Sequence, residues 1–172
     1  MNQKEASKKL GGLGFKYDPE LSTNESKVFI DHKGRPNIAF RGSTRIVDDW
    51  LGSDAKLALG LEKYDKRFQE AKHLTKLVED KYHQPVNVFG HSLGGSLAEK
   101  SGATGNIVTF NKGAGILDIG KTIPKNQHDI RTTSDAVSLL SKTQNYKYGN
   151  LQELQSPETQ GLIDAHGVKN LY

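Results

Sequence analysis

One stretch constrains the fold of this chain more than any other, and it comprises residues 86–99, VNVFGHSLGGSLAE. A short β-prone run leads into an apolar helical pattern through a G-x-S-x-G sequence at residues 90–94. A serine that projects from a tight strand-to-helix turn sits on strained backbone, and glycines two residues to either side leave room for the neighbouring strand and helix. The stretch therefore predicts a nucleophile elbow made of Gly90, His91, Ser92, Leu93 and Gly94.

Further β-prone and helical patterns surround the elbow. Residues 61–83 carry the clearest helical pattern, because apolar side chains recur there at steps of three and four. Strands are predicted at 27–31, 37–40, 86–89, 106–110 and 128–133, the first two as a hairpin. Strand, helix and strand then alternate, which predicts an α/β fold with a mostly parallel central sheet flanked by helices.

Composition bounds the class of protein. A chain of 172 residues with 34% hydrophobic content fits one compact domain. We expect residues 27–172 to form it, with the polar residues 1–26 as a cover segment and 146–161 as a polar tail. The absence of cysteine excludes disulfides, thiolate metal sites and a cysteine nucleophile.

Charge and hydropathy suggest where the chain acts. Neither a secretory signal nor an apolar run of membrane-spanning length occurs, so we expect a soluble protein of the cytoplasm or another intracellular compartment. The net charge of +4 favours an anionic partner, and peripheral contact with an anionic membrane surface fits it. Without a dense Lys/Arg cluster, a solvated basic surface is the simpler explanation, and we expect no nucleic-acid partner.

A serine nucleophile needs a base, usually histidine, that a carboxylate holds in the right tautomer. In α/β hydrolases the chain order is Ser, then Asp or Glu, then His, and only His128 and His166 follow Ser92. We favour Asp135, which follows a predicted strand, and His166, which lies late in a loop of small residues. The structural alternatives are a helix N-cap for Asp135 and an ordinary surface position for His166.

The reaction also needs donors for the oxyanion. The backbone N–H of Leu93 is one candidate, because it follows the serine at the start of a helix. Ser43 is the second, because it lies in a loop after the strand predicted at 37–40. Turn formation alone is the structural alternative for Ser43.

The segments FRGS at 40–43, DWL at 49–51 and GHSLGGSLA at 90–98 together resemble the class 3 (fungal-type) lipases of the α/β-hydrolase superfamily. The resemblance runs from about residue 28 to the C-terminus. It implies an α/β-hydrolase fold with Ser92 as nucleophile, Asp135 as acid, His166 as base, and Ser43 and the Leu93 amide as oxyanion hole. It also implies a packing role for Trp50 and no proton-transfer role for His91.

Two departures from the family pattern bear on the substrate. The sequence NKGAG at 111–115 replaces a Gly-Pro type of sequence, and residues 52–60 leave little room for a long apolar lid. We therefore expect a lipid or small-ester substrate that is more accessible than bulk triglyceride.

The sequence predicts a serine hydrolase that cleaves carboxylic esters of lipids, as a lipase, phospholipase or esterase, through an acyl-enzyme and without metal or cofactor. One alternative is a hydrolase fold kept as a catalytically silent binding or structural module. Another is a P-loop nucleotide binder, because GILDIGKT at 115–122 matches G-x-x-x-x-G-K-[ST]. Pro124 fits poorly into the helix that a P-loop requires at that point.

Overall fold

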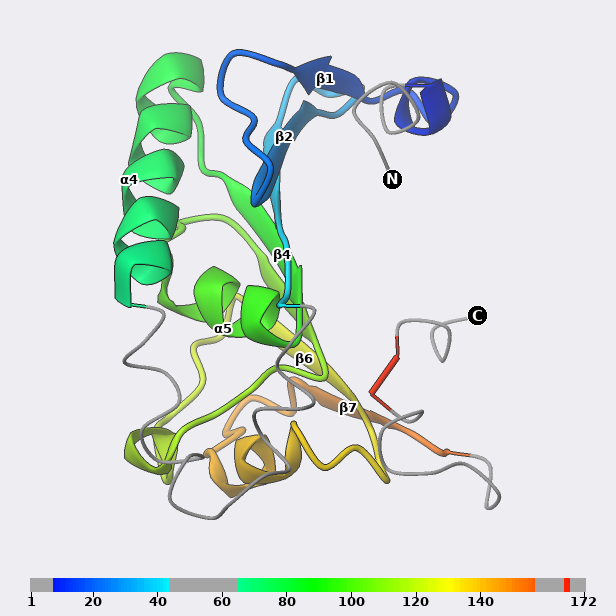
Figure 1. Ribbon diagram of the computed structural model, residues 1–172, viewed down its shortest axis with the longest axis vertical. Helices are drawn as coiled ribbons and strands as arrows, with labels where there is room; N and C mark the ends of the chain where they lie inside the picture. The colour runs from blue at the N-terminus through cyan, green and yellow to red at the C-terminus, as the bar shows by residue number, and fades with distance from the viewer. Residues whose placement is uncertain (1–7, 44–64, 157–165, 168–172) are drawn as a thin grey trace.

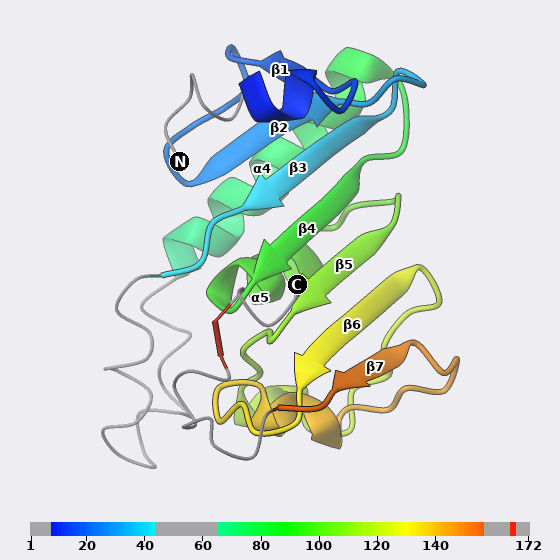
Figure 2. The ribbon, with the colours of Figure 1, turned by 90° about the vertical axis from the view of Figure 1, so that its right-hand side faces the viewer.

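A seven-stranded sheet forms the centre of the computed structural model, which describes residues 8–43, 65–156 and 166–167. The spatial order of the strands follows the order of the chain, as Figure 2 shows face on. The strands are β1 (Lys16–Asp18), β2 (Ser26–Ile30), β3 (Pro36–Phe40), β4 (Asn87–His91), β5 (Ile107–Phe110), β6 (Gln127–Thr132) and β7 (Leu151–Leu154). β1, β2 and β3 pair antiparallel, and β3 through β7 pair in parallel. The predicted α/β domain with a mostly parallel sheet is confirmed.

Local interactions within residues 31–35 close the turn of the β2–β3 hairpin. Asp31 Oδ1 accepts hydrogen bonds from the backbone N–H groups of Lys33 (2.8 Å) and Arg35 (2.9 Å), and Gly34 has a φ of 78°. Such a left-handed position favours glycine because a Cβ is strained there. The predicted hairpin is therefore confirmed together with the turn that closes it.

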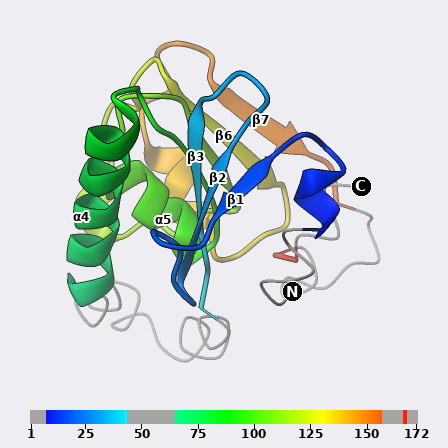
Figure 3. The ribbon, with the colours of Figure 1, turned by 90° about the horizontal axis from the view of Figure 1, so that it is seen from above.

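Two helices cover one face of the sheet (Figures 1 and 3). α4 (Asp65–Tyr82) contacts β3 and α5, and α5 (Leu93–Lys100) contacts β3, β4 and β5. Single 3-10 turns, η2 (Ile116–Asp118) and η3 (Leu139–Thr143), lie in the connections before and after β6. The core between helices and sheet includes Val28, Ile38, Val78, Val88 and Leu97, none more than 2% exposed. The helix predicted over 61–83 is confirmed for its described part.

Two strands of the sheet, β1 and β7, were not predicted from the sequence. β1 lies within the expected cover segment, and its three residues are too few to show alternation. Asp18 at its end accepts hydrogen bonds from Lys81 Nζ (2.8 Å) and the Tyr82 hydroxyl (2.5 Å), which joins this edge of the sheet to α4. β7 lies within the expected polar tail, and its sequence LQEL is partly exposed throughout, as an edge strand can be.

The P-loop interpretation of residues 115–122 is wrong. The segment contains only the single turn η2, Gly120 has a φ of 73°, and Thr122 pairs with Asn145 in an isolated bridge. Since residues 123–126 form no helix and β6 begins at Gln127, the segment does not lead into the helix N-terminus that binds phosphate in a P-loop.

Some expectations concern parts of the chain outside the described residues. The DWL segment with Trp50 and the span 52–60 both lie there. Among the helices that are described, none has the length and apolar composition needed to cross a membrane.

Candidate active site

The elbow places Ser92 on strained backbone between β4 and α5. Its φ of 58° and ψ of −126° are rare for a residue with a side chain. A Cβ on Gly90 would lie 2.0 Å from the Gly94 carbonyl oxygen, and one on Gly94 would lie 2.3 Å from that of Phe40. Both positions therefore require glycine, for the steric reason that the sequence predicted.

The Ser92 hydroxyl is buried and makes no hydrogen bond within the described part of the chain. Leu93 is the first residue of α5, where backbone N–H groups lack partners inside the helix. The loop after β3 passes close by, because a Cβ on Gly42 would lie 3.5 Å from Ser92 Cβ. Ser43 follows in this loop and helps to line a cavity of about 200 Å³. Of the two predicted oxyanion donors, the Leu93 amide thus lies within the elbow, and Ser43 lies in the loop that borders it.

Asp135 and His166 form a buried pair. His166 Nδ1 lies 2.9 Å from Asp135 Oδ1, and the two residues are 5% and 1% exposed. The turn after β6 orients the carboxylate, which accepts hydrogen bonds from the backbone N–H groups of Val137 (3.2 Å) and Ser138 (2.8 Å). Burial raises the pKa of Asp135, but the contacts with His166 and Ser138 outweigh it and hold the pKa below its ordinary value. Asp135 is therefore ionised at neutral pH.

The His166 carbonyl oxygen accepts hydrogen bonds from two side chains near the elbow. His91 Nε2 donates to the His166 carbonyl oxygen (2.6 Å), and Asn111 Nδ2 donates to the same oxygen (3.3 Å). The His91 and His166 rings lie 4.6 Å apart between centroids, and His91 also stacks on Phe110 at 5.5 Å. Burial and the neighbouring His166 ring lower the pKa of His91, so its ring is neutral at neutral pH with the proton on Nε2. His91 and Asn111 therefore bind the backbone of the predicted base next to Ser92.

A buried ionic cluster lies behind the elbow helix. Lys112 contacts the carboxylates of both Glu99 and Asp129, and all three side chains are at most 4% exposed. Gln127 donates to the same two carboxylates at 3.0 and 2.9 Å. The Tyr146 hydroxyl donates to Asp129 (2.9 Å), and burial together with that carboxylate raises the Tyr146 pKa. Sequence reasoning missed this cluster, because its members show no common local pattern.

The structure thus brings His166 to Asp135 and sets His166 against His91, the residue before Ser92. His128, the other candidate base, is exposed near the start of β6, at the opposite end of the parallel strands from the elbow. In the described ranges, no group of three or more His, Asp or Glu side chains could hold a metal ion.

Comparison with known protein families identifies a match over most of the chain. Residues 4–151 match the Tle-like phospholipase domain, a phospholipase-like family. The chain belongs to this family. The Tle-like domain implies a lipid substrate and lipid hydrolase activity. The matched residues include Ser92 and Asp135, whereas His166 lies beyond them. Neither curated proteins nor solved structures gave a match.

Proposed function

We propose that this Tle-like domain hydrolyses carboxylic esters of lipids through a triad of Ser92, His166 and Asp135. Ser92 Oγ attacks the carbonyl carbon while His166 Nε2 takes the hydroxyl proton. The tetrahedral intermediate collapses, the same proton passes to the leaving alcohol, and an acyl group remains on Ser92. Water then attacks this acyl-enzyme with His166 as base, which releases the carboxylic acid and restores the serine.

The orientation of His166 is the observation that carries the proposal. Its Nδ1 faces the Asp135 carboxylate at 2.9 Å, which leaves Nε2 as the nitrogen for proton transfer. Its ring lies 4.6 Å from that of His91, which directly precedes Ser92 in the chain. The ionised Asp135 favours the tautomer with hydrogen on Nδ1 and stabilises the imidazolium that forms. The buried Ser92 hydroxyl makes no hydrogen bond within the described residues. This is compatible with its role as nucleophile, because the contact between nucleophile and base often forms fully only when substrate binds.

In this proposal the oxyanion lies between the Leu93 amide and the loop that carries Gly42 and Ser43. Support comes from the place of Leu93 at the start of α5 and from the close approach of Gly42 to Ser92. Removing one such donor typically costs about a hundredfold or more in rate. The resemblance to class 3 lipases suggests the same arrangement.

Covalent labelling tests the serine. The native chain should react with a fluorophosphonate and hydrolyse p-nitrophenyl esters, and Ser92→Ala should do neither. The control is Ser156→Ala, because that half-buried hydroxyl accepts one long hydrogen bond, from the Ser134 N–H at 3.4 Å, and lies outside the proposed triad. Asp135→Asn and His166→Ala should each lower kcat by about a thousandfold or more with unchanged circular dichroism. If Ser92→Ala were labelled like the native chain, the triad would be wrong, and if the native chain resisted labelling, the silent-module alternative would stand.

A further inference from the structure

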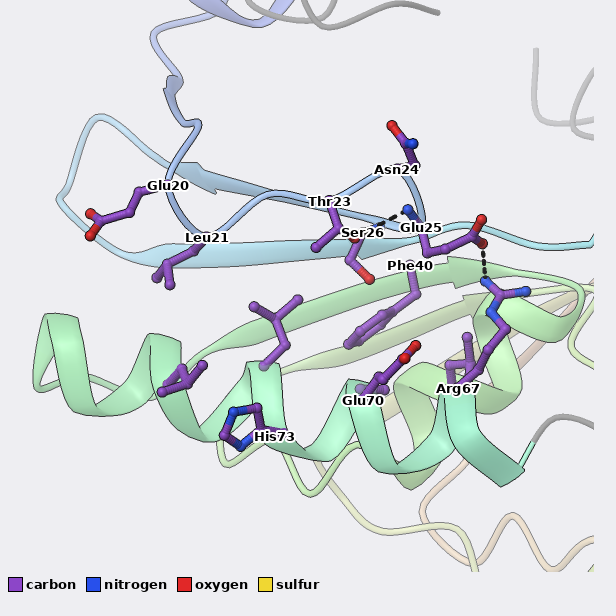
Figure 4. Close-up of a pocket in the computed structure, with 14 residues that line it drawn as sticks. Glu20, Leu21, Thr23, Asn24, Glu25, Ser26, Phe40, Arg67, Glu70 and His73 are labelled. Atoms are coloured by element: carbon purple, nitrogen blue, oxygen red, sulfur yellow. Dashed lines mark hydrogen bonds and ion pairs between the residues drawn. The ribbon is translucent and has the colours of Figure 1, made fainter.

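A largely apolar cavity of about 510 Å³ lies between α4 and the segment that joins β1 to β2 (Figure 4). Its apolar lining includes Leu21, Phe40, Leu74, Leu77 and Leu97. In the close-up, the Leu21 and Phe40 side chains point from the sheet side towards the helix. The volume lies within the range of small-molecule sites, about 300–1,000 Å³.

The cavity adjoins a smaller cavity beside the candidate active site. Glu25 and Arg67 line it and also line the smaller cavity that contains Gly42 and Ser43. Arg67 pairs with Glu25 at 2.8 Å and donates to the Arg41 carbonyl oxygen at 2.6 Å. One ion pair therefore marks the junction between the apolar cavity and the loop that borders Ser92.

The lining of the cavity includes residues of β3 and α5, the two elements that pack beside the elbow. Phe40 ends β3, and its carbonyl oxygen faces Gly94. Leu97 lies one turn after Leu93 in α5. From Arg67, the cavity follows α4 as far as Leu77, a rise of about 15 Å at 1.5 Å per residue. The apolar space is thus elongated and leads away from the nucleophile.

We infer that this cavity binds the acyl chain of the ester whose carbonyl lies at Ser92. The inference rests on the proposed ester hydrolysis for the position of the carbonyl. A long acyl chain is apolar along its whole length and needs no polar partner, which suits the lining of Leu21, Leu74 and Leu97. The charged side chains of the lining are Glu20, Glu25, Arg67 and Glu70, and the Glu25–Arg67 pair stands at the end where the chain would meet the polar ester group. Each methylene that leaves water for such a cavity should favour binding by about fourfold.

Chain-length selectivity tests the inference. Leu74→Trp fills the cavity, and Leu77→Glu places a charge in it at a position already 40% exposed, where folding should tolerate the change. Both variants should lower kcat/KM for p-nitrophenyl dodecanoate by about tenfold or more and leave that for the acetate ester within about twofold. Lys76→Trp, on the exposed side of the same helix, is the matched control and should change neither value.

A binding measurement separates this inference from the catalytic proposal. Ser92→Ala should bind a fluorescent long-chain fatty acid saturably, and adding Leu77→Glu should weaken that binding by about tenfold. If the native chain bound the fatty acid but hydrolysed no ester, the catalytic proposal would be overturned and the assignment of the cavity as an acyl-chain site would be supported. If Leu74→Trp, Leu77→Glu and the native chain all hydrolysed both esters with the same chain-length preference, only the assignment of the cavity as the acyl-chain site would be overturned.

Discussion

Replacing Lys112 by methionine removes the cation on which the buried cluster behind the elbow depends. Lys112 is 2% exposed and contacts Glu99 and Asp129, whose side chains are 4% and 3% exposed. Methionine keeps an unbranched apolar stem but no charge. Two carboxylates would then remain buried with Gln127 as a shared neutral donor.

Two arguments give the size of the effect. Breaking a buried ion pair by removing one partner costs about 3–5 kcal/mol. Burial raises the pKa of Glu99, but Lys112, Lys121 and Gln127 outweigh it and lower the pKa from 4.5 to about 2. A shift of that size corresponds to about 3 kcal/mol in the free energy of unfolding at neutral pH, and Lys112 is the largest of the three causes that lower the pKa. We therefore expect Lys112→Met to lower the free energy of unfolding by about 3 kcal/mol.

Urea unfolding at neutral pH measures this loss. With a slope of about 2 kcal/mol per molar urea, the midpoint should fall by about 1.5 M. Lys121→Met is the matched control, because Lys121 also pairs with Glu99, at 2.9 Å, but is 41% exposed. An exposed partner contributes at most about 1 kcal/mol, so the control midpoint should fall by less than about 0.5 M.

The pH dependence gives a second criterion. Because the folded pKa of Glu99 lies below its ordinary value, its contribution is present above about pH 4.5 and is lost as the pH falls towards 2. The difference in stability between the native chain and Lys112→Met should therefore be largest at neutral pH and should narrow below about pH 4.5. A Lys112→Met midpoint equal to that of Lys121→Met, or a difference that does not change with pH, would refute the reasoning.

Two further predictions concern the elbow and the base. Gly94→Ala should lower the free energy of unfolding by about 3 kcal/mol or more, because the new Cβ would lie 2.3 Å from a carbonyl oxygen. Gly11→Ala has open space, so equal urea midpoints for the two variants would contradict this. Asn111→Asp keeps the acceptor for the Thr132 N–H (2.7 Å) but loses the donor to the His166 carbonyl, and it should lower kcat by about tenfold with KM unchanged. Steady-state kinetics check this, and an unchanged kcat would show that His166 needs no such support.

The elbow could be predicted from sequence because its constraints are local. The strained φ of Ser92 and the need for glycine at 90 and 94 arise within five consecutive residues and the strands beside them. The pairing of His166 with Asp135 was expected from chain order, from their places in a loop and after a predicted strand, and from the family resemblance, and whether they catalyse stays a prediction. β7 could not be predicted, because its two exposed polar residues stand side by side between half-buried leucines, so the strand lacks alternation.

The ionic cluster and the cavity were beyond sequence reasoning for a different reason. Lys112 lies 13 residues from Glu99 in the chain, and Arg67 lies 26 residues from Arg41, so only the completed sheet brings them together. Read alone, a buried lysine after a strand or an arginine early in a helix predicts a solvated side chain. Their partners follow from strand order, which no local pattern specifies.

Lys112 also explains a glycine that the elbow motif does not require. A Cβ on Gly95 would lie 2.7 Å from Lys112 Cβ, so the buried lysine can pass behind α5 only if residue 95 has no side chain. Ser92 is the N-cap of this short helix, and Glu99 lies in its last turn. The contact of Lys112 with Glu99 therefore holds one end of α5, while the packing of Gly94 against β3 holds the other. Because α5 is held at both ends, the position of Ser92 depends on the cluster as well as on its own turn.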